Sequence, residues 1–328
     1  QEIKLPHEPI EGERFGWSVA ISGNRILIGS RYDNVNGEKS GSAYIFKLVG
    51  DQWVKEQKLV PDDGKPNDRF GWSVAIDGDT ALVGAVHDVD DDIGAGAAHV
   101  FHFIDGSGWI EEAMLVASDG EAGDQFGWSV AISGNRLMVG ANEDDDYGDK
   151  SGSVYFYELV DGLWVEIDKF HAGDPDSYEQ FGCSVSLEGD TALIGARWDR
   201  ENGLYSGAAY IFNYNGNNWQ EHQKLIAPDT GESEFGWSAS MSNDIVVIGA
   251  RRETDYAGSA YVYWLDGSDW NFIKKLLPSD GASNDQFGYS VSVSGSYAII
   301  GARKHEDNGI ESGSAHIFDV GDLDDDGV

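Results

Sequence analysis

Closely spaced aspartates are the residues of this chain whose pattern best fits metal binding. Ca²⁺ takes about six to eight oxygen ligands at about 2.3 to 2.6 Å, and alternating carboxylates bent by a glycine can supply them. Two such runs precede Gly94 and Gly148. Their aspartates are Asp88, Asp90, Asp92, Asp144 and Asp146. We therefore predict calcium at these residues, with a solvated acidic loop as the alternative.

Four arginines form a second candidate site, because each follows a Gly-Ser or Gly-Ala pair at the same point of a repeat. They are Arg31, Arg197, Arg251 and Arg303. A guanidinium group can fork onto a carboxylate or sulfate, so these residues could bind an anionic glycan. The alternative is pairing with the acids Asp68, Asp124 and Asp285.

The last residues, 321–328, form an acidic tail with a calcium-like pattern. Asp322, Asp324 and Asp326 stand at positions one, three and five, and Gly327 at position six, as in the start of an EF-hand loop. The later ligands of such a loop are not in the sequence. A plain acidic tail is the alternative.

No constellation of residues indicates catalysis. His99 and His316 stand at strand positions where other repeats carry residues such as Tyr44 and Val154, and Cys183 replaces a tryptophan within a strand. A buried cysteine of this kind is a packing residue rather than a nucleophile. We name no catalytic residue and no cofactor other than Ca²⁺, and the sequence favours a binding protein over an enzyme.

Composition excludes several classes of partner. Lysine and arginine number 22 against 58 acids, which gives a net charge of -36. Such a charge repels nucleic acid phosphates and anionic lipids, so we expect no nucleic acid partner. No apolar run approaches the roughly 20 residues of a membrane helix, so membrane insertion is not expected.

The elements that position these residues come from an internal repeat. Phe-Gly recurs at intervals of 52 to 56 residues. The six copies begin at Phe15, Phe70, Phe126, Phe181, Phe235 and Phe287. Each copy has four apolar stretches rich in Val, Ile, Tyr, Phe and Trp, which predict strands. In the first copy these are Phe15–Ile21, Ile26–Ser30, Ser42–Leu48 and Trp53–Leu59.

Short turns of Ser, Gly, Asn and Asp join the first strand to the second, which predicts antiparallel hairpins. Four-stranded antiparallel meanders repeated at this period are typical of propeller blades. The predicted fold is all-β: one six-bladed β-propeller of four-stranded antiparallel blades over residues 1–320. The tryptophans after Phe-Gly and in the fourth strands are predicted to pack between blades, with sugar binding as the alternative.

The two chain ends predict how the ring closes. The sixth copy has strands at Phe287–Val293, Ala298–Ala302 and Ser314–Phe318, and no fourth strand follows. Gln1–Leu5 resembles the fourth-strand ending Glu56–Leu59. We predict that this N-terminal strand completes the sixth blade, which removes two open sheet edges.

The predicted binding face lies on one edge of the sheets. Because strand direction alternates, the links between second and third strands share an edge with the links between blades. The former are long, such as Arg31–Gly41 and Arg197–Gly207, whereas the opposite edge has tight turns. Long loops on a rigid scaffold commonly carry recognition.

Three recurring motifs carry a family resemblance. Phe-Gly-Trp-Ser-Val-Ala-Ile at 15–21, Leu-Val-Gly-Ala at 82–85 and Gly-Ser-Ala-Tyr-Ile-Phe at 41–46 resemble the FG-GAP repeat over essentially the whole chain. That repeat forms the integrin alpha propeller and occurs in secreted or surface bacterial proteins. Short turns such as Ser133–Arg136 replace the integrin calcium loop, and proline does not follow Gly-Ala, so the chain is most similar to the bacterial short-turn type.

The resemblance implies an extracellular or cell-surface recognition and scaffold module. We expect it to bind a protein or glycan through the long-loop face, with help from calcium at the acidic loops. A carbohydrate-active enzyme of polysaccharide lyase type and an architectural surface or filament protein are the alternatives. The C-terminal pattern resembles the start of a dockerin repeat, which implies an anchoring partner for a continuation of the chain.

Overall fold

The structure is a computed structural model that describes residues 12–88, 94–229, 231–306, 309 and 312–321. Six antiparallel sheets make up the chain, five of four strands and one of three among these residues. Within the described part of the chain a single short helix, α1 (Glu253–Tyr256), interrupts them. The fold is an all-β, six-bladed β-propeller, as predicted.

The chain divides into two compact units, and the first spans Gln1–Asp145 and Ser153–Lys169. It contains sheets 1 to 3, which are numbered in chain order and have four consecutive strands each. Their strands are β1 (Phe15–Ser22), β2 (Arg25–Ser30), β3 (Ser42–Val49), β4 (Gln52–Leu59), β5 (Ser73–Asp77), β6 (Thr80–Ala85), β7 (Ala97–Ile104), β8 (Gly108–Leu115), β9 (Phe126–Ser133), β10 (Arg136–Ala141), β11 (Ser153–Val160) and β12 (Leu163–Phe170).

The second unit spans Asp146–Gly152 and Phe170–Val328 and contains sheets 4 to 6. Their strands are β13 (Phe181–Glu188), β14 (Thr191–Ala196), β15 (Ala208–Tyr214), β16 (Trp219–Leu225), β17 (Phe235–Ser242), β18 (Ile245–Ala250), β19 (Ser259–Asp266), β20 (Asp269–Leu276), β21 (Phe287–Ser294), β22 (Tyr297–Ala302) and β23 (Ser314–Asp319). The predicted completion of sheet 6 by Gln1–Leu5 lies outside the described residues.

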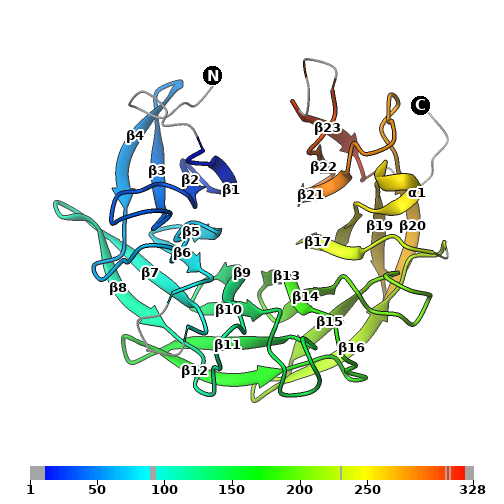
Figure 1. The fold of residues 1–328 in the computed structure, drawn as a ribbon, viewed down its shortest axis with the longest axis horizontal. Coiled ribbons are helices and arrows are strands. Elements are labelled where there is room, and N and C mark those ends of the chain that lie inside the picture. The colour runs from blue at the N-terminus through cyan, green and yellow to red at the C-terminus, as the bar shows by residue number, and fades with distance from the viewer. Residues whose placement is uncertain (1–11, 89–93, 230, 307–308, 310–311, 322–328) are drawn as a thin grey trace. The chain divides into compact units, whose positions relative to one another are not determined.

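Within each unit, neighbouring sheets pack face to face and bury a core between them. In the first unit, Leu27 and Ile45 of sheet 1 meet Phe70 and Val83 of sheet 2. In the second, Leu193 and Ile211 of sheet 4 join the cluster that surrounds Phe235. Within each unit, the first strands of neighbouring sheets pack against one another, whereas their fourth strands hardly touch. The sheets of a unit therefore spread apart from their first to their fourth strands, as propeller blades do (Figure 1). Of the fourth-strand tryptophans, Trp109, Trp219 and Trp270 are buried, as the packing prediction requires, whereas Trp53 and Trp164 are half-buried.

In sheet 4 the Phe-Gly motif forms an irregular start of the first strand, β13. Phe181 is fully buried, and the register between β13 and β14 shifts between Phe181 and Ser184. Gly182 has a φ of +82°, which a glycine adopts without strain. Gly195, directly opposite Ser184, is equally constrained, because a Cβ there would lie 2.0 Å from the carbonyl oxygen of Gly236 in the next sheet.

Within each unit, the loops between second and third strands lie beside the links between sheets, on what we call the long-loop edge. The amide of Asn67 donates to the carbonyl of Glu38 at 2.8 Å, and the amide of Phe235 donates to Ser206 at 3.0 Å. The predicted sharing of one edge is thus confirmed within the units. No helix in the described ranges is long and apolar enough to span a bilayer.

Candidate functional site

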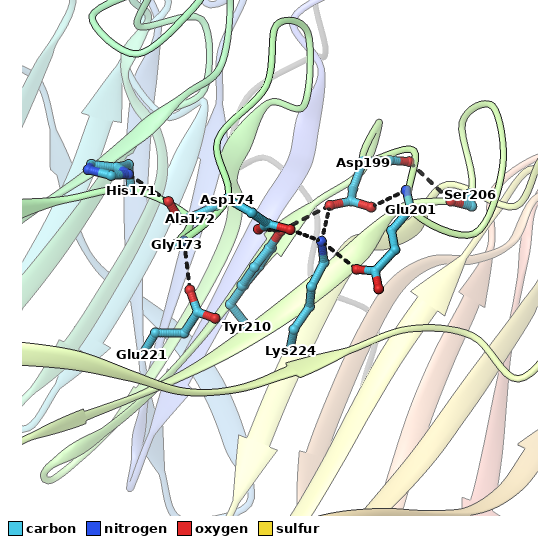
Figure 2. Close-up of polar contacts among 10 residues, drawn as sticks. All are labelled: His171, Ala172, Gly173, Asp174, Asp199, Glu201, Ser206, Tyr210, Glu221 and Lys224. Carbon is cyan, nitrogen blue, oxygen red and sulfur yellow. Dashed lines mark hydrogen bonds and ion pairs between the residues drawn. The ribbon is translucent and has the colours of Figure 1, made fainter.

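An ion cluster around the buried side chain of Asp199 holds the β14–β15 loop of sheet 4 (Figure 2). The ammonium nitrogen of Lys224 lies 2.7 Å from a carboxylate oxygen of Asp199, and 2.8 Å from oxygens of both Asp174 and Glu201. The hydroxyl of Tyr210 donates to Asp199 at 2.9 Å. Asp199 is only 1% exposed, so its charge needs these partners to be stable in the protein interior.

The sequence builds this cluster from four separate segments. Tyr210 on β15 stands directly opposite Lys224 on β16. Asp199 comes from the β14–β15 loop and Asp174 from the link that precedes sheet 4. The cluster therefore ties both segments of the long-loop edge to the sheet. We call such a set of loop acid, third-strand tyrosine and fourth-strand lysine an anchor cluster.

Anchor clusters recur in sheets 1, 3 and 5. Their members are Asp33, Tyr44 and Lys58; Asp144, Tyr155 and Lys169; and Glu253, Tyr261 and Lys275. Burial alone would raise the pKa of Asp33, but the hydrogen bond and charge of Lys58, with hydrogen bonds from Ser42 and Tyr44, outweigh burial and lower it. The loop acid is thus held in its ionised form by the lysine.

Sheets 2 and 6 depart from this arrangement. In sheet 2, His99 replaces the tyrosine and Met114, directly opposite it, replaces the lysine. In sheet 6, His316 occupies the tyrosine position and His305 the loop position, where it contacts Asp285 at 2.8 Å. The strand register corrects one alignment from the sequence: His99 pairs with Val83 as Tyr155 pairs with Val139, so its counterpart is Tyr155 and not Val154.

The residues predicted to bind calcium fall in different surroundings. Asp88 is 2% exposed and contacts the Nε2 atom of His99 at 3.3 Å, while Asp144 belongs to the anchor cluster of sheet 3. Asp146 is exposed and belongs to the second unit. The remaining candidates, Asp90, Asp92, Asp322, Asp324 and Asp326, lie outside the described residues. Calcium binding therefore stays a prediction.

Two of the predicted ligand-binding arginines are sandwiched between aromatic rings. The guanidinium carbon of Arg31 lies 3.4 Å from the ring centre of Trp17 and 4.4 Å from that of Trp72. That of Arg251 lies 3.2 Å from Trp237, and its Nε donates to Glu234 at 2.7 Å. Both contacts are typical cation–π geometries.

The other two arginines also lie over aromatic rings. Arg197 lies 4.5 Å from the ring centre of Trp237 and is only 7% exposed, and exposed Arg303 lies 4.9 Å from that of Tyr289. The acids proposed as their partners have other contacts. Asp68 and Asp124 accept backbone amides of their own links, and Asp285 contacts His305.

A set of exposed side chains on the long-loop edge of the second unit did not emerge from the sequence. Tyr147 is 45% exposed, Tyr178 40% and Leu204 55%. The Tyr147 ring lies 3.7 Å from that of His171, and the Tyr178 hydroxyl donates to Asp149. Their loops carry acids and glycines like every other loop, so no local pattern distinguishes these positions. We call Tyr147, Tyr178 and Leu204 the exposed apolar set.

A family model described as FG-GAP repeat matches nearly the whole chain. The matched residues are 6–46, 53–101, 109–157, 164–212, 219–263 and 270–318. The chain belongs to the FG-GAP repeat family. Each of the five later FG-GAP matches begins in the fourth strand of one sheet and ends in the third strand of the next, so the family repeat is offset from the blade. FG-GAP repeats are typical of extracellular proteins.

Solved structures share the fold of this FG-GAP protein. A putative 6-phosphogluconolactonase from Bacteroides uniformis ATCC 8492 is 10% identical with a TM-score of 0.61, over 93% of this chain and 86% of that one. One from Bacteroides fragilis NCTC 9343 is 10% identical with a TM-score of 0.59, over 93% and 80%. No curated protein sequence matches the chain. At this identity the likeness shows the fold alone.

Proposed function

We propose that the chain is an extracellular recognition module that binds a protein or glycan through its long-loop edge. Family membership supports the location, because FG-GAP repeats are typical of extracellular proteins. Rigid loops support the binding role, since a surface that is ordered before binding loses less entropy on complex formation. The anchor clusters provide that order in four of the six sheets.

The observation that carries this proposal is the exposed apolar set of the second unit. Tyr147 and Tyr178 present their rings on segments whose backbones are held by hydrogen bonds, such as that from the Tyr178 amide to the Asp149 carbonyl at 2.6 Å. Arg200 lies beside Tyr178, with its guanidinium carbon 5.9 Å from the ring centre. Fixed aromatic rings with polar neighbours suit the apolar face of a sugar or an apolar side chain of a protein.

Binding measurements on a double variant test this function. We expect wild-type protein to bind at least one member of a panel of immobilised neutral polysaccharides and extracellular matrix proteins. Tyr147→Ala/Tyr178→Ala should raise the Kd at least about tenfold, since buried aromatic contacts dominate such interfaces. Tyr297→Ala is the matched control, because Tyr297 is 59% exposed but begins β22, at the opposite edge. Equal affinity of the double variant and the wild type would refute the proposal.

A second candidate is a carbohydrate-active enzyme of lyase type in sheet 6. His305 and Asp285 line a hollow of roughly 570 Å³ together with Lys304. The ring of His316 lies 6.2 Å from that of His305. A histidine beside a carboxylate can act as a general base on an acidic sugar.

Turnover of pectate and alginate tests the enzyme candidate. The ultraviolet absorbance of an unsaturated product should rise with wild-type protein and stay flat with His305→Ala. A flat trace with the wild type would remove this candidate and leave the recognition role unaffected.

A further inference from the structure

Sheet 2 lacks the cation that the anchor clusters contain. Where Lys58 and Lys224 stand opposite Tyr44 and Tyr210, Met114 stands opposite His99. The acids have not been lost with the lysine. Asp88 occupies the loop position, and Glu111 on β8 lies beside His99. Two coupled replacements in one sheet thus remove an ammonium group and introduce an imidazole among carboxylates.

The side chains around His99 have the arrangement of metal ligands. His99 is fully buried, and its Nδ1 atom lies 2.7 Å from Oε1 of Glu111. Asp63, His99 and Glu111 each offer a ligand atom, and these atoms lie within 4.8 Å of one another. Asp63 comes from the link between sheets 1 and 2, at the position that Asp119 and Asp174 occupy in the links before sheets 3 and 4.

We propose that sheet 2 binds one Zn²⁺ ion through Nδ1 of His99, Oε1 of Glu111 and a carboxylate oxygen of Asp63. Zinc bonds to nitrogen and oxygen are about 2.0 to 2.2 Å long, so the ligand atoms of a tetrahedral ion lie about 3.3 to 3.6 Å from one another. All three atoms are within 4.8 Å, and Nδ1 of His99 and Oε1 of Glu111 would move apart from 2.7 Å when the ion takes the place of the proton between them. A water molecule completes the tetrahedron. The imidazole ligand favours zinc over calcium, which takes oxygen ligands.

The remaining contacts of these ligands are those of an outer shell. Nε2 of His99 faces Asp88 at 3.3 Å, so this carboxylate can accept a hydrogen bond from the Nε2–H group and leave Nδ1 free for the ion. The amide of Asp62 donates to Oε2 of Glu111 at 2.9 Å, which leaves Oε1 toward His99. Glu166, the counterpart of Glu111 in sheet 3, also accepts a link amide but faces Tyr157 instead of a histidine.

A further buried acid increases the negative charge at this point. Asp68 is fully buried, and among the described residues its Oδ1 atom has no hydrogen-bond partner. Its charge acts on both Asp88 and His99. A divalent ion would balance this group of acids as lysine does in sheets 1, 3, 4 and 5. The competing explanation is that His99 supplies the positive charge itself, as an imidazolium group.

Zinc titration of chelator-treated protein distinguishes the two explanations. Isothermal titration calorimetry is done in excess Mg²⁺, which occupies exposed carboxylates, and should show one tightly bound Zn²⁺ ion per chain. Addition of Zn²⁺ should also raise the Tm of the protein. His99→Tyr/Met114→Lys restores the residues of the anchor cluster, so it should fold and lose that equivalent. Co²⁺ should give visible absorption of tetrahedral type with the wild type and not with this variant.

Single substitutions at matched positions serve as a second test that does not depend on the double variant. Glu111→Gln should weaken zinc binding at least about tenfold, whereas Glu166→Gln should not alter it. Absence of a tight equivalent in the wild type would mean that His99 is a protonated ion-pair partner. A Zn²⁺ ion that still binds tightly to His99→Tyr/Met114→Lys would have to lie at other acids. Either of these two results would overturn the proposal. The site belongs to the first unit, so these outcomes are independent of the recognition role.

Discussion

Buried carboxylates in this chain differ in whether a cation faces them. Asp199 contacts Lys224, whereas Glu179, two residues before the fourth Phe-Gly motif, is 5% exposed with no ion pair among the described contacts. Burial, with a smaller contribution from the charge of Asp199, raises the pKa of Glu179 to about 7. The folded state therefore favours the protonated, neutral form of Glu179.

Glu179 should make stability fall as pH rises. Its pKa is higher in the folded than in the unfolded chain, so the folded chain holds the extra proton between about pH 4.5 and pH 7, and the free energy of unfolding declines over that window. Glu179→Gln cannot ionise. We expect this variant to be more stable than the wild type at pH 8 by about 1 to 3 kcal/mol, and no more stable at pH 4.

Urea unfolding at several pH values measures this effect. Glu38→Gln is the matched control, because Glu38 is exposed and should show no such dependence. Parallel pH profiles of Glu179→Gln and the wild type would contradict the assigned pKa.

At the scale of the element, the penultimate lysine of a fourth strand positions a loop that is distant in sequence. Lys224 on β16 contacts Asp199 in the β14–β15 loop and Asp174 in the preceding link. Lys224→Met should leave Asp199 buried without its cation. We expect a loss of about 2 to 4 kcal/mol in the free energy of unfolding, as is usual when one partner of a buried pair is removed.

Denaturant unfolding of Lys224→Met beside Lys55→Met tests the role of the anchor cluster. Lys55 is an exposed lysine of a fourth strand outside the anchor cluster, so its replacement should change stability by less than about 0.5 kcal/mol. Equal effects of the two substitutions would show that the cluster contributes little to stability.

The elements themselves could be predicted closely from the sequence. The first predicted strand, Phe15–Ile21, is observed as Phe15–Ser22, and the last, Ser314–Phe318, as Ser314–Asp319. Alternating apolar residues and Gly-rich turns act locally, so their signal is contained within a few residues. The repeat then fixed the number of sheets, because each copy contributes one set of strands.

The candidate site could be predicted only in part, because its contacts cross strands and links. The spacing of acids in its loop predicts that Asp144 binds calcium, but its partner is the ammonium group of Lys169. That lysine lies on another strand, so the loop sequence alone does not reveal it. For Arg251 the alternative to ligand binding is pairing with an acid such as Asp68, two residues before Phe-Gly, yet its observed partner is Glu234, one residue before the motif. Which side chain turns toward which depends on the register and on the bulge at Phe-Gly, and neither is visible in the spacing of residues.

At the scale of the whole molecule, an ionic cluster at the loop between second and third strands recurs from sheet to sheet, with different residues. Sheets 1, 3, 4 and 5 hold their loops with lysine, and sheet 2 carries histidine and acids at the equivalent place. In a chain with a net charge of -36, the lysines of sheets 1, 3, 4 and 5 allow buried acids to serve as internal anchors. The exposed acids remain available for solubility and for contacts with a ligand.

The central claim is that the long-loop edge is ordered before any ligand binds, and hydrogen exchange over the whole chain tests it most directly. Amides such as that of Gly207, which donates to Asp199 at 2.9 Å, should exchange at least about 100-fold more slowly than in an unstructured chain. Peptides from residues 31–41 and 197–207 should then show protection comparable to that of the adjoining strands. Exchange of these loops at unstructured rates beside protected strands would contradict the account.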